Sequence, residues 1–194
     1  MSFMELNITI FRMINDLGKQ HTYLNSSAIF IAEYMVFVLA LAVIVLWFTR
    51  NGQNRLMIVS GVMTFVLAEI LGKLAGQLHS NNQPFAELPH VHMLIEKAVN
   101  NSFPSDHTIL FFSFCVSFWL FKKGWWVLWI MLAFLVGLSR IWVGVHFPAD
   151  VLAGATLSTI SGLAVYLVLP NISLIHKLLE RYEQKVPSSS TKRK

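Results

Sequence analysis

The chain has 194 residues, of which 55% are hydrophobic and only 13% charged, whereas soluble domains carry about 25% charged residues. A soluble domain of this length would need more polar surface, and the apolar character, 10 Gly, 6 Pro and single Cys exclude disordered, collagen-like and disulfide-rich chains. A polytopic membrane protein of one domain remains, so the net charge of +5 indicates membrane orientation and anionic lipid rather than nucleic acid.

The first 26 residues predict an amphipathic helix and not a cleaved signal peptide. Charged residues are spread through this segment instead of preceding an apolar block. The apolar residues recur with a helical period; they are Phe3, Leu6, Ile10, Phe11, Ile14 and Leu17. We expect residues 1–26 to lie at the membrane interface, and packing against the rest of the protein is the alternative.

Five apolar stretches follow, and a bilayer-spanning helix needs about 20 such residues. They cover residues 28–48, 56–78, 107–121, 125–143 and 149–169. The sequence therefore predicts an all-α membrane protein in which residues 27–170 form a bundle of five transmembrane helices.

The distribution of Lys and Arg predicts the orientation of these spans. Basic residues lie in the first connection (Arg50 and Arg55), in the third (Lys122 and Lys123) and in the tail 171–194. Because cytoplasmic loops are enriched in Lys and Arg, we assign all three to the cytoplasm and expect the end of the tail to be disordered. The N-terminus and the connections 80–106 and 144–148 then face outward.

This topology brings the ends of four spans to one outer face, and polar residues gather at each of these ends. Ionisable groups at membrane depth are costly, so they indicate a functional site. The candidates, in chain order, are Lys73, Asn82, Gln83, Ser105, Asp106, His107, Arg140, His146 and Asp150.

The pair His146 and Asp150 has the spacing of neighbours on one helix face. A carboxylate bonded to one imidazole nitrogen fixes the tautomer and leaves the other nitrogen free as a base, a ligand or a nucleophile. The alternative is structural: Asp150 caps the last span and His146 is an interface histidine.

Three further residues suit phosphate binding, and each also has a structural alternative. Ser105 stands where the N-cap of the third span is expected, beside free N–H groups that favour an anion. Arg140 can bind phosphate oxygens in a bidentate manner and Lys73 adds a second charge. The alternatives are a capping serine and cations that extend to the interface.

Taken together, two histidines, an orienting carboxylate, two cations and a helix start are what phosphoryl transfer through a phosphohistidine requires. The sequence contains no Cys/His cluster or carboxylate cage, so we expect no obligatory cofactor. His90 and His92 could hold a metal ion, and a solvated loop pair is the alternative.

At this point the chain resembles a known family. Residues 104–107, Pro-Ser-Asp-His, match the P-S-[GD]-H motif of the type 2 phosphatidic acid phosphatase (PAP2) superfamily, and residues 139–150 match its S-R-x5-H-x3-D motif at every fixed position. The whole chain is similar to the bacterial undecaprenyl-pyrophosphate phosphatases of the bacitracin-resistance type.

The resemblance implies a function and residue roles. The expected reaction converts undecaprenyl pyrophosphate to undecaprenyl phosphate and inorganic phosphate at the outer face of a bacterial plasma membrane, which recycles the cell-wall lipid carrier and confers bacitracin resistance. His146 matches the nucleophile, Asp150 its orienting carboxylate and His107 the group that protonates the leaving oxygen. Arg140, Ser105 and Lys73 match phosphate-binding positions. The expected partners are a polyprenyl pyrophosphate and the bilayer, without a nucleic acid or a required protein.

The chain departs from the family at the first motif, K-x6-R-P. Lys73 is present, but Ser80 and Asn81 stand where Arg-Pro is expected, and Gln83-Pro84 follows instead. Gln83, Asn82 or His79 could donate hydrogen bonds in place of the missing cation.

Two rival functions and one alternative role for the histidines remain open at this point. One keeps the chemistry and changes the substrate to phosphatidic acid, phosphatidylglycerol phosphate or another isoprenoid pyrophosphate. The other is a membrane transporter or scaffold with buried polar residues, and haem ligation by His107 and His146 is a third arrangement to be tested.

Overall fold

The computed structural model describes residues 2–49, 51–169 and 172. These residues form helices and two short 3-10 turns without any strand, which confirms the predicted all-α class. The α-helices are α1 (Phe3–Gln20), α2 (Asn25–Phe48), α3 (Gly52–Leu78), α4 (Pro84–Glu87), α5 (Asp106–Lys122), α6 (Val127–Trp142) and α7 (Pro148–Val168). The predicted cytoplasmic tail 171–194 lies outside the described residues, apart from Ile172.

Among the described residues, four helical segments are long and apolar enough to cross a membrane: Thr22–Phe48, Gly52–Leu78, Gly124–Trp142 and Pro148–Val168. They correspond to four of the five predicted spans. The remaining one corresponds to α5, which has 17 residues and therefore extends for only about 26 Å. A count of five spans thus stays a prediction.

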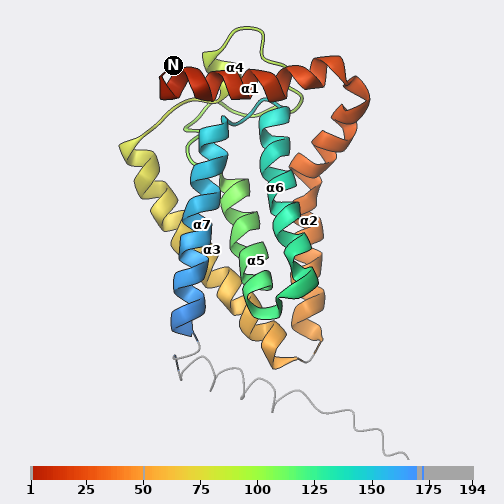
Figure 1. Ribbon diagram of the computed structural model, residues 1–194, viewed down its shortest axis with the longest axis vertical. Helices are drawn as coiled ribbons and strands as arrows, with labels where there is room; N and C mark the ends of the chain where they lie inside the picture. Colours follow the sequence, from red (N-terminus) through yellow and green to blue (C-terminus); the bar gives the residue numbers. More distant parts are fainter. Residues whose placement is uncertain (1, 50, 170–171, 173–194) are drawn as a thin grey trace, which may run out of the picture.

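Helix α5 forms the centre of the bundle (Figure 1), in contact with α3, α6 and α7. Its residues from Phe111 to Phe118 are buried without interruption, which is what an α-helix that is apolar on every side requires. Small residues let its neighbours approach closely. A Cβ atom on Gly61 of α3 would lie 2.7 Å from the Phe114 ring, and one on Gly72 of α3 would lie 2.9 Å from the Ile109 side chain.

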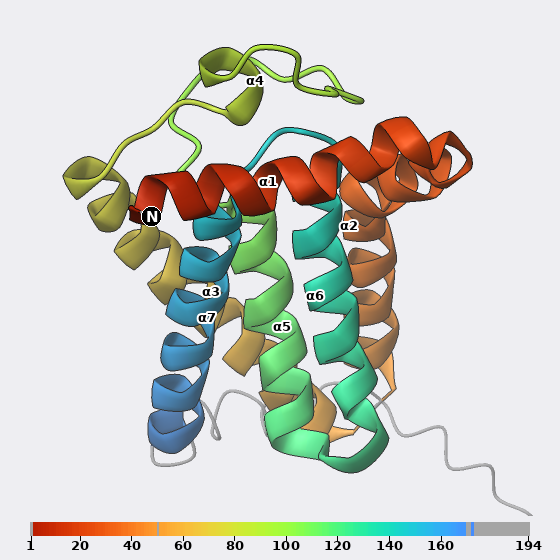
Figure 2. The ribbon, with the colours of Figure 1, turned by 45° about the horizontal axis from the view of Figure 1, so that its top comes forward.

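The two ends of the bundle differ. One end, called the loop end below, carries α1, α4, the segment 79–105 and the turn 143–147 (Figure 2). The opposite end carries the short connections from α2 to α3 and from α5 to α6. Lys122 ends α5 and Lys123 begins the second connection, whereas Arg55, predicted in the first connection, is buried in the first turn of α3. The fold thus gathers the polar segments that the sequence singled out at the loop end.

Helix α1 lies across the loop end (Figure 2) and is both packed and exposed. A capping box of Ser2 and Glu5 begins it. Phe11 is fully buried beside Phe147, whereas Phe3 is 73% exposed. The buried Asn15 side chain donates to the Trp142 carbonyl at 2.8 Å. The amphipathic helix is confirmed, and its inner face packs on the bundle; its position on the outer side of a membrane stays a prediction.

Candidate active site

The segment 100–107 crosses the loop end between α3 and α7 and carries the Pro-Ser-Asp-His motif. The Ser105 N–H donates to the Asp150 carbonyl at 3.1 Å. Two glycines allow its close approach: a Cβ on Gly76 would lie 2.8 Å from the Phe103 carbonyl oxygen, and one on Gly154 would lie 3.0 Å from that of Ser105. The motif is therefore fixed against both helices, next to the start of α7.

His146 and Asp150 are nearly inaccessible to solvent and lie together at this point. The His146 side chain is 3% exposed, and its Nδ1 atom lies 3.5 Å from Oδ2 of Asp150. Ser102 joins the two: its Oγ atom lies 3.2 Å from Nδ1 and donates to Oδ2. The chain Nδ1–H to Oγ–H to carboxylate fixes Nε2 as the unprotonated ring nitrogen.

The structure brings His146 and Asp150 together in a different way from the predicted one. His146 precedes α7 and does not share a helix face with Asp150. Phe147 is extended, as expected for a residue before proline, and Pro148 begins the helix. The Asp150 carboxylate accepts the Phe147 N–H at 2.9 Å. The carboxylate therefore caps α7 and also lies beside His146, so its structural role as a cap is compatible with the predicted orienting role.

Lys97, in the segment between α4 and α5, faces the other ring nitrogen. Its Nζ atom lies 3.1 Å from Nε2 of His146. A lysine ammonium only donates hydrogen bonds, so Nε2 accepts, which agrees with the tautomer set by Ser102. Burial, opposed by the hydrogen bond to Asp150 and reinforced by the charges of Lys97 and Arg140, lowers the pKa of His146 to about 4. The imidazole is thus neutral and its Nε2 lone pair available near neutral pH.

Arg140 and His107 complete the polar surroundings of His146. Arg140 is buried on α6, and its Nη1 atom donates to the Ala32 carbonyl at 2.9 Å. Its buried Nε atom has no partner among the described residues. His107, in the first turn of α5, is close enough to interact electrostatically with Arg140, His146 and Lys97. Both predicted residues are therefore close enough to His146 to interact with it electrostatically.

Ser105 is the N-cap residue of α5, as its position before the apolar run predicts. Its side chain makes no capping bond, and its buried Oγ atom lacks a partner within the described part of the chain. A buried hydroxyl without a partner is costly. Ser105 therefore has a donor free for a ligand.

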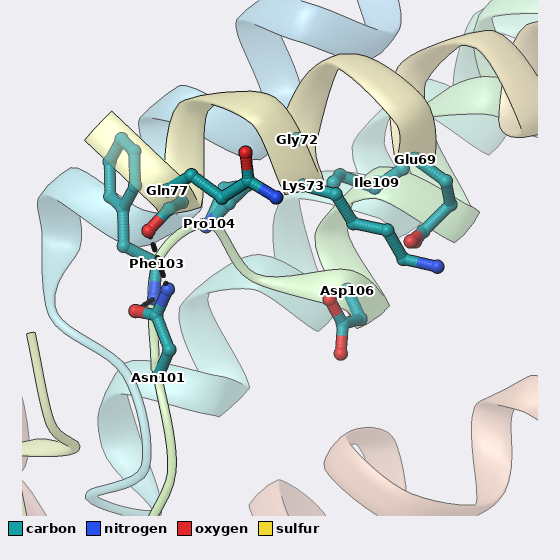
Figure 3. A pocket seen from close by; sticks show the side chains of 10 residues that line it. Glu69, Gly72, Lys73, Gln77, Asn101, Phe103, Pro104, Asp106 and Ile109 are labelled. Carbon is teal, nitrogen blue, oxygen red and sulfur yellow. Dashed lines mark hydrogen bonds between the residues drawn. The ribbon is translucent and has the colours of Figure 1, made fainter. Parts of the chain in front are cut away.

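Lys73 lies beside the start of the Pro-Ser-Asp-His motif. It lines an open pocket of about 340 Å³ with Glu69, Asn101, Pro104 and Asp106. Figure 3 shows Lys73 and Glu69 extending side by side from α3, with Asp106 below them. His107, Arg140 and His146 do not line this pocket. The structure thus places Lys73 beside two carboxylates, one of which, Asp106, also interacts electrostatically with Lys97 and Arg140. The phosphate-binding role of Lys73 stays a prediction.

Gln83 and Asn82 occupy the region of the altered first motif. The Gln83 side chain is fully buried: its amide donates to Asn100 Oδ1, and its oxygen accepts the Asn100 N–H at 3.0 Å. Asn82 is exposed, and its N–H donates to Glu87 at 2.7 Å. Gln83 thus binds the polypeptide itself instead of offering a donor to a ligand.

Sequence reasoning missed Ser102 and Lys97. Ser102 has no distinctive sequence signal, because it precedes the Pro-Ser-Asp-His motif and is placed by the fold. Lys97 had one: it is the only Lys or Arg between Ser80 and Asp106, in a connection assigned to the side that basic residues avoid. In the described part of the chain, no three metal-ligating side chains converge, at His90 and His92 or elsewhere.

The fold and the site together define a class: a helical membrane protein with a buried, oriented histidine and nearby cations, suited to phosphoryl transfer. A family model described as the PAP2 superfamily matches residues 81–173. The chain belongs to the PAP2 superfamily.

Individual relatives cover nearly the whole chain. It is 57% identical to a protein of Bacillus licheniformis named bacitracin transport permease protein BcrC, over 95% of this chain and 91% of that one. It is 31% identical to the undecaprenyl-diphosphatase BcrC of Bacillus subtilis, over 96% of this chain and 98% of that one. The crystal structure of Aquifex aeolicus LpxE superposes with a TM-score of 0.63 at 26% identity, over 82% of this chain and 94% of that one.

Proposed function

We propose that this protein is an undecaprenyl-diphosphatase that releases inorganic phosphate from undecaprenyl pyrophosphate and leaves undecaprenyl phosphate. The observation that carries the proposal is the buried His146, whose Nδ1 faces Ser102 and Asp150 while Nε2 faces a cation. The name of the Bacillus subtilis relative supports the choice of lipid.

In the first step, Nε2 of His146 attacks the terminal phosphorus and forms an N–P bond while the bridging P–O bond breaks. Asp150 stabilises the imidazolium that develops, through Ser102 and directly at 3.5 Å. The negative charge of the bound substrate favours the protonated form of His107, which then gives its proton to the departing lipid phosphate. Arg140, Ser105 and the free N–H groups at the start of α5 hold the phosphoryl oxygens.

In the second step, water attacks the phosphorus of phospho-His146. His107, now neutral, accepts a proton from this water, the N–P bond breaks, and inorganic phosphate leaves with Nε2 restored. The overall reaction consumes one water and needs no oxidant, reductant or cofactor. We propose that none is obligatory, because every role is filled by a side chain of this chain.

An apolar groove beside the site suits the lipid tail. It lies between α2 and α6 and is lined by residues that include Ser27, Ile31, Leu138 and Ser139. Ser139 directly precedes Arg140, so a phosphate bound at the guanidinium would lie near the groove. The first isoprene units can thus stay beside the bilayer, and the enzyme need not extract its substrate.

We assign the loop end to the outer face of a bacterial plasma membrane. The opposite end carries Lys122, the last residue of α5, and Lys123, in the connection to α6, which suits the cytoplasmic side. On the outer face, the reaction recycles the lipid carrier of cell-wall synthesis. It also removes the pyrophosphate that bacitracin targets, so expression should raise bacitracin resistance.

The test is phosphate release by the purified protein in detergent. Wild type should hydrolyse undecaprenyl pyrophosphate, and His146→Ala should lose at least about 10³-fold in rate because the nucleophile is gone. His21→Ala, at the exposed C-terminal end of α1, is the matched control. Full activity of His146→Ala would refute the mechanism, and equal rates on phosphatidic acid or phosphatidylglycerol phosphate would refute the choice of lipid.

The transport interpretation is tested by the same preparation. The Bacillus licheniformis relative is named a transport permease protein, and a transporter alone would release no phosphate in detergent. Bacitracin resistance that survives His146→Ala would favour transport. Resistance lost together with phosphate release would favour hydrolysis.

A further inference from the structure

The proposed phosphatase lacks the arginine of the K-x6-R-P motif, and the residues around that motif do not replace it. Lys73 lines a pocket with Glu69 and Asp106, whose carboxylates oppose its charge. Gln83 is neutral, fully buried and paired with Asn100. Arg140 would then be alone in neutralising a substrate group that carries several negative charges.

We propose that Lys97, outside every family motif, supplies the second phosphate-binding cation of this site. This inference rests on the proposed function and deepens it, because it names the residue that holds the phosphoryl oxygens together with Arg140. The side chain reaches the site from the loop end, where the substrate's head group must enter.

The position of the Lys97 ammonium carries the inference. It lies 3.1 Å from Nε2 of His146, the atom that must approach phosphorus. An attacking nitrogen needs the space that the ammonium occupies, so Lys97 has to yield this contact when substrate enters. The phosphoryl oxygens are bonded to this phosphorus at about 1.5 Å. The displaced ammonium can therefore bind them after a small movement.

The peptide around Lys97 is held in register by the altered motif itself. Gln83 exchanges two hydrogen bonds with Asn100. The Ser102 N–H donates to the Asn81 carbonyl at 2.8 Å, and the Asn101 amide donates to the Gly76 carbonyl at 3.0 Å. The glutamine that replaces arginine therefore fixes residue 100, three positions after Lys97, and so helps to hold Lys97 at the site.

The charges around Lys97 favour an anion. Burial, followed by repulsion from Arg140, lowers the pKa of Lys97, and the carboxylates of Asp106 and Asp150 offset this only in part. Lys97 and Arg140 therefore leave an excess of positive charge at the site. A bound phosphate dianion would neutralise this excess.

The test restores a cation chemically at residue 97. Lys97→Cys is compared with Lys19→Cys, a lysine of α1 at the loop end whose ammonium contacts Asp16 and the His90 carbonyl instead of His146. The one natural cysteine, Cys115, is buried. Each protein is treated with aminoethyl methanethiosulfonate, which adds an ammonium, or with methyl methanethiosulfonate, which adds no charge.

Lys97→Cys should lose about 100-fold in kcat/KM on undecaprenyl pyrophosphate, as for loss of one donor to a transition state. The aminoethyl reagent should restore at least tenfold and the methyl reagent should not, whereas Lys19→Cys should stay within about twofold throughout. Because the comparison is made within one preparation, misfolding cannot imitate it. A fully active Lys97→Cys, or equal effects of the two reagents, would overturn the proposal.

Stabilisation by orthovanadate, followed as the thermal midpoint, separates this inference from the choice of lipid. Vanadate should raise the midpoint of wild type and of aminoethylated Lys97→Cys, and much less that of the methylated protein. If wild type fails to hydrolyse undecaprenyl pyrophosphate but shows this pattern, the lipid is wrong and Lys97 is correct. If wild type hydrolyses the lipid and vanadate acts equally on all forms, Lys97 is wrong and the function stands.

Discussion

Ser102 is the residue whose removal tests the site geometry most directly. Its hydroxyl accepts from Nδ1 of His146 at 3.2 Å and donates to Oδ2 of Asp150. Ser102→Ala removes this link and leaves the direct Nδ1 to Oδ2 separation of 3.5 Å, which is too long for a good hydrogen bond. The variant isolates the link because the Ser102 N–H bond to Asn81 is kept.

The expected magnitude follows from these distances. A hydrogen bond to a charged group contributes about 1.5–3 kcal/mol. His146 can recover part of this by moving a few tenths of an ångström toward Asp150, so we expect a loss of about 1–2 kcal/mol. That corresponds to a decrease in kcat of about 5- to 30-fold. Asp150→Asn removes the charge itself and should cost about 10³-fold or more.

The assay is phosphate release from undecaprenyl pyrophosphate by both single variants and the double variant. If Ser102 acts by joining His146 to Asp150, Ser102→Ala should cost less than about threefold when it is added to Asp150→Asn. Ser113→Ala is the control, since Ser113 is also a buried serine, located within α5, whose Oγ atom has no partner among the described residues. It should leave kcat unchanged.

Two results would refute this reasoning. If Ser102→Ala keeps the wild-type kcat, the hydroxyl does not take part in orienting His146. If the cost is the same with and without Asp150→Asn, Ser102 acts on the protein independently of Asp150. The thermal midpoint of each variant distinguishes either result from a general loss of folding.

Two further predictions concern pH and the lipid tail. The folded-state pKa of His146 is lowered from 6.5 to about 4, so only the unfolded chain gains this proton between those values, and stability should fall as pH decreases through this window. His146→Gln should therefore lose about 5 °C less than wild type in thermal midpoint between pH 7.5 and 4.5; an equal loss would contradict the burial of a neutral imidazole. Ser27→Trp fills the groove between α2 and α6 and should raise KM at least fivefold for undecaprenyl pyrophosphate but not for a short isoprenyl pyrophosphate; equal KM values would place the tail elsewhere.

The helices could be predicted from composition and periodicity, since an apolar run of about 20 residues has few structures available in a bilayer. Their ends could not. The span expected to begin at residue 56 belongs to α3, which begins at Gly52 because the Asn51 side chain accepts the N–H groups of Gln53 and Asn54. Such capping extends a helix beyond its apolar part, where hydrophobicity gives no signal.

The site could be predicted where residues are close in sequence and not where the fold brings them together. His146 and Asp150 are near each other because only a turn and one proline separate them. Lys73 and Gln83 were assigned by motif spacing, but the fold places Lys73 beside Glu69 and Asp106 and pairs Gln83 with Asn100. No periodicity encodes the path of that segment.

The charges at the loop end explain why Lys97 stands out. Two other basic residues there, Arg12 and Lys19, bind the carbonyls of Pro89 and His90 and so attach α1 to the loop. Backbone carbonyls satisfy both of them without any ligand. Lys97 faces an imidazole nitrogen instead, a partner whose single lone pair the proposed reaction must use. A cation that opposes the usual charge bias and lacks a carbonyl or carboxylate partner in the described contacts needs an anion, and phosphate is the anion that this site is built to bind.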